Sequence, residues 1–581
     1  MMILLPLLIA GAGDAADWIA EDFRGWKMSA LEVRGAPGES EAIRRGLSLA
    51  EAAEFYPRAL ATDIARVRLY LARNGYPNTN ITPEFEPDRG KRSVRVVLRV
   101  DPGLPVRVGK VNVEGLPEAE ARTGTPQGLA EGAVFRESAA ANAAGALERR
   151  LKERGYAFAT VAWNVEPGNA GNVSVMFRVE AGDVFSFRDV SVEGISEDLE
   201  PVVKQTANMR PGARYHPVVV TEATTNLRLL GLFRLVRVRV DSVAPGEIDL
   251  VAELTERKPR SIDWGLGYWT DEGVRTRARW EHRNLFRRGR GGSIAGTFSR
   301  FRQSGRLSAW THTLFGTRNY ASVSMKTVRE DEESYRLTET GGELAIRRRP
   351  SLFSTRTATL SVSDIRVEET SDDPDAFGGR DGLLTTLRLA SDRNTADDRL
   401  YPAGGSRWET WTEWGLPGSF SESHFLAAAS SGSMYRAAGG TVFAARLTLG
   451  AAGPTAGSDA LLPNKRFYAG GAYSMRGFQR RKLGPKDSDG SPLGGEALLE
   501  ASLEWRFPIA GIVGGALFVD SGQVWHERTE VRADEIEAAI GPSIVFRTPV
   551  GPVRGDWAYR LTNLDDTENR SVFHVIVGHP F

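Results

Sequence analysis

The residue with the clearest chemical task in this sequence is Arg476. It opens the tripeptide Arg476-Gly477-Phe478, inside a segment of about 40 residues, 453–494, that is rich in glycine and aromatic residues. Unpatterned connections longer than about 12–15 residues are usually functional or disordered, and this composition favours an ordered tip that packs. A guanidinium group taken out of water needs carboxylate partners, and a bidentate pair supplies both energy and geometry. The predicted chemistry is therefore anchoring of the segment rather than catalysis.

Three carboxylates are candidate partners: Glu504, Asp520 and Asp556. Each belongs to the polar set of a segment that alternates between apolar and polar residues; in 500–507 the polar set reads Glu, Ser, Glu, Arg. Successive side chains of a strand point to opposite faces. A charge at every second position costs about 2–4 kcal/mol per residue at mid-depth in lipid, so this face must be wet. The alternative is that these charges only line a wet surface, each with weak, exposed partners.

Other reactive chemistry is not indicated. The chain has no cysteine, so a disulfide, a thiolate nucleophile and a cysteine-ligated metal are excluded. It has no phosphate-binding GxxxxGK[ST] loop and no HExxH zinc motif, and its seven histidines are scattered. We expect no cofactor, no metal and no enzymatic activity, although the many acidic residues leave a hydrolytic carboxylate pair as an open alternative.

Charge and hydropathy exclude several classes of protein. The 74 Lys and Arg residues balance the 74 Asp and Glu residues, which argues against a basic nucleic-acid platform and against an acidic disordered chain. The mean hydropathy is −0.29, and no apolar run approaches the roughly 20 residues of a transmembrane helix. A membrane-spanning β-barrel stays possible because its alternating strands barely raise the average hydropathy.

The first residues predict export. Residues 1–13 form an apolar run that is too short to cross a bilayer but long enough for the core of a signal peptide. Small residues follow, so we place a signal peptide at 1–16. No Lys or Arg precedes the run, which leaves a misassigned start codon and a buried apolar start as alternatives.

Three repeats occupy the next part of the chain. A short alternating segment ends in glycine three times, at Gly35, Gly115 and Gly194, which are 80 and 79 residues apart. Helical segments and then two alternating segments follow each glycine, so each repeat is predicted to be a β-α-α-β-β unit. The predicted units are 28–103, 106–183 and 185–259. They are either stacked spacers or binding modules, because the free edge of a small sheet can add an extended peptide.

After Pro259 the helical period disappears and alternation continues to the end of the chain. We count sixteen candidate strands, an even number, with an average of about 20 residues for a strand and its loop. That spacing suits a tilted membrane-spanning strand of about 9–11 residues with its turn. We therefore predict a 16-stranded antiparallel transmembrane β-barrel over 260–581. A soluble sandwich with one wet face is the alternative, and it would have to protect its edges over sixteen strands.

The order of these elements resembles a known superfamily. The Arg476-Gly477-Phe478 motif precedes the segment GEALLEASLEWRFPI, and FVDSGQVW, GPVRGD and a terminal Phe581 follow. Together these motifs are similar to those of the outer-membrane β-barrel assembly and translocation superfamily, of the BamA and TamA type. The three repeats look like its POTRA domains. Three such units favour the TamA branch, since the BamA branch usually has five and two-partner secretion transporters usually have two with a plug helix.

The resemblance carries implications for the candidate site. It implies that Arg476 descends into the barrel lumen and pairs with the wall near Glu504 and Asp520, with Asp556 in a neighbouring polar set. Within the motif, the glycine would permit a close approach and the phenylalanine would pack against the wall.

The predicted barrel must close where its first strand meets its last. The first strand carries Gly265 and Gly267, and the last contains Val577 and Gly578 and ends at Phe581. Glycine weakens a strand interior, and a proline near the end of the chain cannot donate to the ladder. We therefore expect few hydrogen bonds here and a weak lateral seam that can open sideways.

The resemblance implies an outer-membrane protein of a Gram-negative bacterium with its POTRA units in the periplasm. Its expected function is insertion of unfolded outer-membrane or autotransporter clients through the seam. The expected partners are a TamB-like, inner-membrane-anchored periplasmic protein and outer-membrane lipid, with no nucleic acid. The alternatives are a secretion pore that passes clients through the lumen and the outer-membrane end of a lipid-transfer bridge. A plain structural role would leave the three tandem units unexplained.

Overall fold

The computed structural model describes most of the chain and divides it into two compact units. One unit contains the first two repeats with parts of the third, and the other contains the rest of the third repeat and the large C-terminal sheet. The predicted signal peptide lies outside the described residues. The described residues are 21–37, 43–44, 46–50, 52–123, 128–168, 171–286, 288–314, 319–351, 353–369, 377, 381–398, 400–418, 421–455, 458–548, 551–562 and 570–577.

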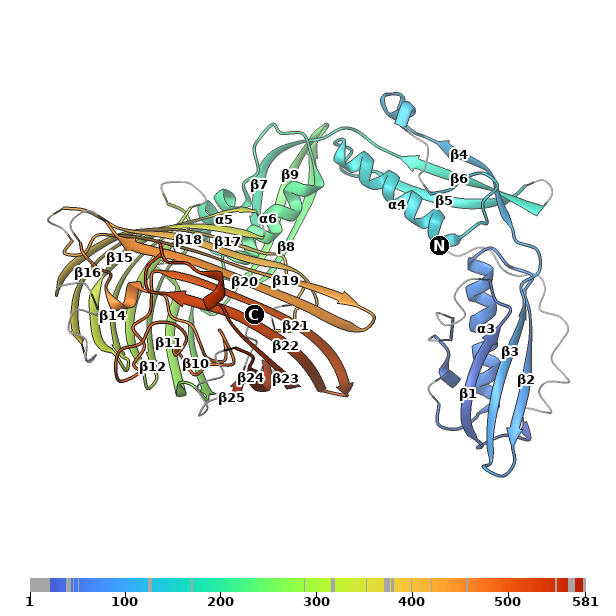
Figure 1. The fold of residues 1–581 in the computed structure, drawn as a ribbon. Helices are drawn as coiled ribbons and strands as arrows, with labels where there is room; N and C mark the ends of the chain where they lie inside the picture. The colour runs from blue at the N-terminus through green and yellow to red at the C-terminus, as the bar shows by residue number, and fades with distance from the viewer. Residues whose placement is uncertain are drawn as a thin grey trace. The chain divides into compact units, whose positions relative to one another are not determined.

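Each repeat forms a three-stranded sheet packed against helical segments (Figure 1). In all three the last strand lies in the middle, in the orders β1-β3-β2, β4-β6-β5 and β7-β9-β8. The strands are β1 (Lys27–Arg34), β2 (Asn80–Asp88), β3 (Ser93–Asp101), β4 (Arg107–Glu114), β5 (Thr160–Pro167), β6 (Asn172–Glu180), β7 (Ser186–Glu193), β8 (Phe233–Ala244) and β9 (Glu247–Glu256). The helices are α3 (Pro57–Arg73), α4 (Glu137–Glu153), α5 (Glu200–Ala207) and α6 (Pro217–Leu229).

The predicted pair of helices in every repeat is only partly correct. The third repeat has both, α5 and α6. In the second repeat a 3-10 helix, Glu118–Thr123, stands in the place of the first helix. A run of six residues, soon followed by Gly124 and Pro126, is too short to propagate an α-helix. Within the described ranges, no helix is both long enough and apolar enough to cross a membrane.

The repeating glycines have a common structural reason. Gly35, Gly115 and Gly194 all have positive φ angles, of 83°, 78° and 81°. In each case an added Cβ would lie only 2.2–2.4 Å from a carbonyl oxygen of the central strand, in Val100, Val179 and Leu254 respectively. Only glycine fits such a position without strain. These glycines end the first strand where the chain turns closely over its sheet.

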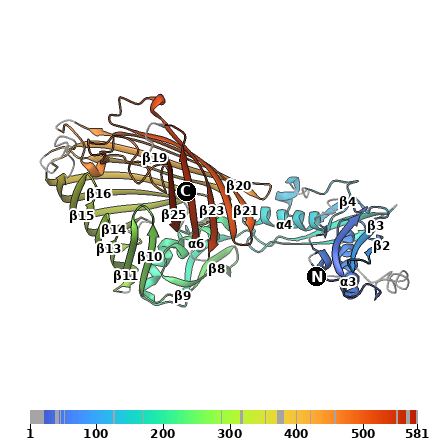
Figure 2. The same ribbon diagram turned by 60° about the horizontal axis from the view of Figure 1, so that its bottom comes forward.

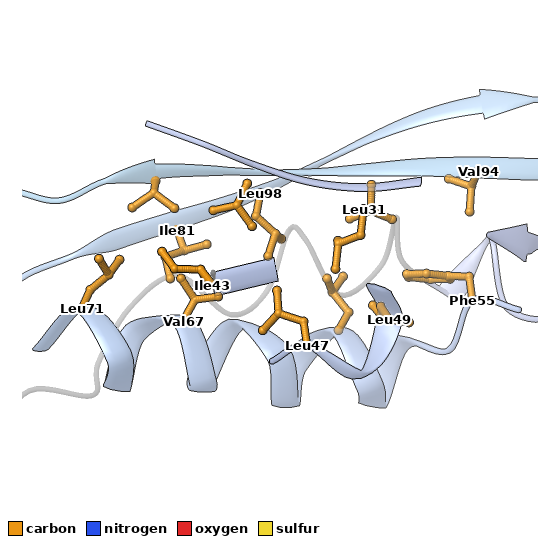
Figure 3. Close-up of a cluster of buried hydrophobic side chains, with 14 residues drawn as sticks. Leu31, Ile43, Leu47, Leu49, Phe55, Val67, Leu71, Ile81, Val94 and Leu98 are labelled. Atoms are coloured by element: carbon orange, nitrogen blue, oxygen red, sulfur yellow. The ribbon is translucent and has the colours of Figure 1, made fainter. Parts of the chain in front are cut away.

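The core of the first repeat lies between α3 and its sheet (Figure 3). Leu60, Val67 and Leu71 share one face of α3 and are buried against sheet residues such as Val96 and Leu98. Burial of each such side chain stabilises the unit by about 1.5–3 kcal/mol. These three residues are spaced seven and four apart, which is the spacing of one helix face.

The C-terminal part forms one antiparallel sheet of sixteen strands in sequence order, from β10 to β25 (Figures 1 and 2). This confirms the predicted fold class and number of strands. The first eight are β10 (Arg260–Trp269), β11 (Gly273–Leu285), β12 (Arg290–Phe298), β13 (Arg302–Thr311), β14 (Tyr320–Asp331), β15 (Tyr335–Ser351), β16 (Ser354–Glu369) and β17 (Gly382–Asn394). The others are β18 (Gly404–Gly415), β19 (Phe425–Ala438), β20 (Thr441–Pro454), β21 (Ala497–Ala510), β22 (Val513–Trp525), β23 (Glu537–Thr548), β24 (Gly551–Arg560) and β25 (Ser571–Val577).

Alternate residues of the large sheet face outward and inward. On β21, Leu503 and Trp505 are 63% and 40% exposed, whereas Ser502 and Glu504 are buried. The apolar set therefore forms the outer surface and the polar set faces the lumen. Because β10 follows the third repeat directly, the strands with even labels begin at the barrel end that carries the repeats.

Replacing Gly115 with alanine tests the glycine at the end of the first strand. Positive φ costs an alanine about 1–2 kcal/mol, and the overlap with the Val179 oxygen adds about 1–3 kcal/mol. We expect faster hydrogen exchange of the β4–β6 amides in the Gly115→Ala protein. Gly132→Ala is the matched control, because Gly132 has a φ of 82° in the same repeat and no atom lies within 4 Å of the place that a methyl group would take. Equal exchange in the two variants would contradict the packing argument.

Candidate functional site

The long connection between β20 and β21 is an ordered structure that folds into the barrel. It doubles back on itself through bridges that pair Phe467 with Gly495 and Ala469 with Leu483. Met475 and Phe478 at its tip are 0% and 4% exposed. We call residues 458–496 the inner loop. Its buried apolar side chains pack together with Leu498 and Val524 of the barrel wall, so the loop is an ordered segment that packs, as the glycine and aromatic content predicts.

Arg476 lies at the tip of the inner loop and is 1% exposed. Its Nε and Nη2 donate to the two carboxylate oxygens of Asp520, both at 2.6 Å, and its Nη1 donates to Glu504 at 2.9 Å. Its Nη2 also donates to the Ser502 hydroxyl, and the guanidinium carbon lies 3.4 Å from the centre of the Phe518 ring. The charge is thus held by a bidentate fork, a second carboxylate and an aromatic face, which fixes both position and angle.

The two carboxylates belong to a larger buried network. Arg554 donates to both oxygens of Glu504, at 2.8 and 2.6 Å, and to Asp556 at 2.6 Å. Arg506 donates to Glu504 at 2.6 Å as well. Three guanidinium groups, including that of Arg476, therefore face three carboxylates. A buried ion is costly unless it is paired, and this balance removes the cost of an uncompensated charge.

The other two residues of the motif fit the wall at close range. An added Cβ on Gly477 would lie 2.5 Å from the Ala539 Cβ, so no larger residue fits there. The Gly477 carbonyl accepts a hydrogen bond from Arg560 Nε at 2.8 Å. The same guanidinium lies 4.0 Å from the centre of the Phe478 ring. The motif is therefore held at two points. Its own Arg476 binds the carboxylates of the wall, and Arg560 of the wall contacts Gly477 and Phe478.

A second anchor holds the other side of the inner loop. Arg480 donates to both carboxylate oxygens of Glu332, at 2.5 and 2.8 Å, in the turn between β14 and β15. Arg481 lies 3.3 Å from the same carboxylate and stacks on Tyr468, 4.3 Å from the ring centre. The loop is therefore anchored both to β21 and β22 and to the turn between β14 and β15.

β10 and β25, the first and last strands of the sheet, lie side by side (Figure 2). Only a short stretch of the two segments is hydrogen-bonded within the described residues. Backbone contact within the described part is confined to Thr270, which donates from N at 3.4 Å and from Oγ1 at 3.1 Å to the Val575 carbonyl. The Thr270 hydroxyl also accepts the Val575 N–H at 2.6 Å. A threonine side chain thus supplies pairing that a regular ladder would take from the backbone.

The inner loop also contacts both strands of the seam. Trp269 Nε1 of β10 donates to the Tyr473 hydroxyl at 2.6 Å, and this hydroxyl lies 3.3 Å from the Val577 carbonyl of β25, to which it can donate. Beside it, Asp271 accepts the Ala472 N–H at 2.7 Å. We use the name seam clasp for the two hydrogen bonds of the Tyr473 hydroxyl together with the contacts of the Asp271 carboxylate. One loop residue therefore joins the first and last strands.

Asp271 also reaches the last strand. His574 Nδ1 of β25 lies 3.2 Å from its carboxylate, and His574 Nε2 lies 2.8 Å from the Arg476 carbonyl oxygen. Burial opposes ionisation of Asp271, but His574 and the Ala472 N–H outweigh it, so the pKa of Asp271 lies below its usual value. The ionised carboxylate links β25, the inner loop and the turn after β10.

The structure brings together some of the residues selected from the sequence but not all of them. Arg476, Glu504 and Asp520 are in direct contact, while Asp556 joins them through Arg554. Gly265 and Gly267 belong to the inward set of β10, and Val577 faces outward. Gly578 and Phe581 lie outside the described residues. The sequence reasoning did not select the residues that complete the network and the clasp, which are Arg506, Phe518, Arg554, Thr270, Asp271, Tyr473 and His574.

No metal centre is indicated by the geometry. In the described ranges no group of three or more His, Asp or Glu side chains is arranged to hold an ion. The buried carboxylates are instead occupied by guanidinium groups. The site is therefore a mechanical anchor that fixes a loop in a lumen.

A barrel with an apolar outer face, preceded by tandem sheet-and-helix modules, is an outer-membrane β-barrel with periplasmic POTRA domains. A model of the Omp85 superfamily domain matches residues 284–581. A POTRA model, described as a surface antigen variable number repeat, matches 27–103 and 106–182. The chain therefore belongs to the Omp85 superfamily. Its BamA-like members are assembly or transport factors rather than enzymes, as the sequence predicts.

Several known proteins are similar to this chain. BamA of Neisseria meningitidis serogroup B is 22% identical over 95% of this chain and 78% of its own length. BamA of Nitratidesulfovibrio vulgaris is 23% identical over 72% of this chain and 54% of its own length. The crystal structure of Haemophilus ducreyi BamA lacking POTRA domains 1–3 has a TM-score of 0.62 at 18% identity, covering 81% of this chain and 99% of that one. These likenesses do not separate the TamA branch from the BamA branch, so the TamA assignment stays a prediction.

Removing the Arg476 side chain is expected to release the inner loop. Arg476→Ala leaves Asp520 without its bidentate partner, and loss of one member of a buried ion pair costs about 3–5 kcal/mol. The measurement is tryptic cleavage at Arg480 and Arg481 in the folded protein, which should become at least about tenfold faster. Arg532→Ala, at an exposed position between β22 and β23, is the control. Unchanged protection of the loop would show that the ion pairs do not hold it.

Replacing Tyr473 with phenylalanine is expected to loosen the last strand. The ring is kept but both hydrogen bonds of the hydroxyl are lost, at about 0.5–1.5 kcal/mol each. Hydrogen exchange of the β25 amides should become about fivefold or more faster. Tyr559→Phe, on the outer face of β24, is the matched control. If both variants exchange like the parent protein, the hydroxyl bridge does not stabilise the seam.

Proposed function

We propose that this protein inserts client β-strands into the outer membrane through the seam between β10 and β25. One observation carries the proposal. All other neighbouring strands of the barrel are joined by runs of paired residues, whereas in the described part of the chain β10 and β25 meet through Thr270 and Val575. This fits the broader outer-membrane insertion or secretion role to which the relatives point.

The physical reason lies in the solvent around the seam. Lipid offers no hydrogen bonds, so an unpaired strand edge in a bilayer is costly for the protein and for a client alike. An opened β10 would present such an edge, and a client strand could pair with it. Trp264 and Leu266 on the outer face of β10 are 81% and 70% exposed, as a strand that borders lipid requires. Pairing and burial supply the free energy, and no nucleotide is needed.

The route through the lumen is less well supported. A client that passed through it would have to displace the inner loop, and with it the Arg476 and Arg480 anchors. Breaking buried ion pairs of this kind costs several kcal/mol for each uncompensated charge. Opening the seam breaks the contacts of Thr270 and the seam clasp instead. This comparison favours the lateral route over the secretion pore.

The edges of the POTRA sheets differ in their ability to receive a strand. On β2 of the first repeat, Pro83 lies opposite Leu98 and Pro87 lies opposite Val94. Because the two prolines are four residues apart, their backbone nitrogens point toward the same edge of the strand. β2 stays paired with β3 on both sides of Pro83 and as far as Asp88. We therefore infer that the N–H groups that the prolines lack would have pointed to the free edge of the sheet. β5 has no proline before Pro167. We propose the β5 edge of the second repeat as the receiving edge for an extended segment.

The proposed occupant of that edge is an unfolded outer-membrane or autotransporter client, or a TamB-like protein anchored in the inner membrane. The count of three repeats, each with the order of strands typical of a POTRA domain, supports the TamA-like assignment. A lipid-transfer role at the end of a periplasmic bridge would use the same edge and would not need the seam to open.

Locking the seam tests the proposed function. Continuing the register from Thr270 and Val575 places Tyr268 opposite Val577, with both side chains outward. The chain has no cysteine, so Tyr268→Cys with Val577→Cys introduces a single possible disulfide. We expect the oxidised protein to stop displaying a reporter autotransporter on the cell surface and to recover when reductant is added.

Gly265→Cys with Val577→Cys is the matched control, because these residues face opposite sides of the sheet and should cross-link poorly. Continued display with a fully formed Tyr268–Val577 disulfide would contradict lateral insertion. It would favour passage through the lumen or the lipid bridge.

A further inference from the structure

A group of arginines stands on the outer face of the barrel without an acidic partner. Arg348 of β15 and Arg356 of β16 are direct partners in the strand register. Both are exposed, and neither forms an ion pair with any residue that the structure describes. Like charges directly opposite each other on neighbouring strands repel, with Cβ atoms about 4.5–5.5 Å apart. Such a pair is stable only where an anion or water offsets the repulsion.

A third arginine extends the group. Arg356 lies opposite Ser391 of β17, and Arg393 follows two residues later on the same face. This places Arg393 diagonally beside Arg356, at about 7–8 Å between Cα atoms. Arg393 is exposed as well and lies opposite Trp408 of β18, which is 44% exposed. We call Arg348, Arg356 and Arg393 the arginine triangle.

The alternation of the strands shows that the triangle faces outward. Leu344 and Ile346 of β15, at the positions four and two residues before Arg348, are 47% and 39% exposed. Leu360 of β16, four residues after Arg356, is 41% exposed. These apolar residues belong to the lipid-facing set, and the arginines continue the same set beyond them. The triangle is therefore at the edge of the apolar surface and outside the lumen.

The height of the triangle places it at the level of lipid headgroups. It lies at the barrel end that carries the POTRA domains, where β16 begins, and this end faces the periplasm. Toward the extracellular end of β15, the outward set becomes polar again at Thr340, eight residues from Arg348. Eight residues span about 27 Å along a strand, which is about 21 Å in height at a tilt of about 40°. The apolar band of an outer-membrane barrel is about 25 Å tall, so the arginines stand at its lower border.

The outward sets of the three strands carry no acidic residue near the triangle; Asp397 and Asp398 lie in the turn after β17, where their carboxylates accept backbone N–H groups of that turn. On the outward sets of β15, β16 and β17 the acidic residues are Asp364 and Glu368, and both lie at the opposite, extracellular end. There Asp364 is already within 3.4 Å of Arg366. An exposed aromatic residue, Phe353, lies in the hairpin next to Arg356 and is 54% exposed. Arginine beside exposed aromatic rings is the composition of a surface that binds the membrane interface.

We propose that the arginine triangle binds the phosphate of an anionic phospholipid in the periplasmic leaflet. Guanidinium groups recognise phosphate oxygens with bidentate geometry. Two register partners and a diagonal neighbour present three such groups to one headgroup, while Trp408 lies opposite Arg393 at the same level. The bound phosphate would offset the repulsion between Arg348 and Arg356. This site is independent of the seam, which lies on other strands.

The test uses the full-length protein in nanodiscs of phosphatidylcholine with about one-fifth phosphatidylglycerol. Lipids that stay bound after transfer to detergent are counted by native mass spectrometry. We expect phosphatidylglycerol to be enriched over the bilayer ratio, and Arg348→Gln with Arg356→Gln to lower the enrichment by about fivefold for each arginine lost. Arg366→Gln is the matched control on the same strand, because it faces outward at the extracellular end and should change nothing.

Each outcome decides the proposal. No enrichment with the parent protein, or equal enrichment in the double variant, overturns it and leaves an acidic protein as the occupant. Loss of the enrichment on adding inorganic phosphate would show a general anion site rather than a lipid site, and would also overturn it. Comparison of gel mobility with and without heating checks that the variants are folded. If the double variant fails this check, Arg356→Lys and Arg356→Gln replace it, and only the glutamine protein should show the enrichment lowered by about fivefold.

Discussion

The structure depends on one constraint: hydrocarbon offers no hydrogen bonds to a peptide backbone. A chain that crosses the outer membrane as strands must pair every strand with a neighbour, and the sheet must therefore close on itself. Fifteen neighbouring pairs meet this demand along β10 to β25. The junction of β10 and β25 meets it through a threonine hydroxyl and a loop tyrosine. Among the residues that the structure describes, this junction has the fewest hydrogen bonds of any two neighbouring strands, and side chains there replace backbone pairing.

A second consequence of closure is that the lumen must be organised without a large apolar core. The inner loop fills part of it, and its tip is fixed by ion pairs as well as by apolar contact with Leu498 and Val524 of the wall. The guanidinium groups of Arg476, Arg506 and Arg554 are matched by three carboxylates of the wall. Buried ion pairs add little net stability compared with apolar packing, but they tolerate few alternative arrangements. The network therefore determines the position of the inner loop and contributes less to the stability of the barrel.

Much of the fold could be predicted from the sequence because period and turn residues are local signals. The sixteen strands and the repeating glycines follow from such patterns. The polar face that carries Glu504 follows from alternation alone, whereas its contact with Arg476 was suggested by resemblance. Arg554 and Tyr473 were not selected, because their partners depend on the path of the inner loop across the lumen. Thr270 was missed for a similar reason, since the offset between the first and last strands is set by the tilt of the whole barrel.

The seam clasp has a consequence for how the two faces of the membrane communicate. Tyr473 belongs to a loop that enters the lumen from the extracellular side, while its hydroxyl contacts the carbonyl of Val577. The position of the loop and the closure of the wall are then linked equilibria. By the reciprocity of linkage, if a molecule that binds the loop at the cell surface changes the affinity of the seam for an entering strand, the strand changes the affinity of the loop for that molecule by the same factor. A strand entering the seam from the membrane would, in turn, change how the loop presents itself to the cell's surroundings.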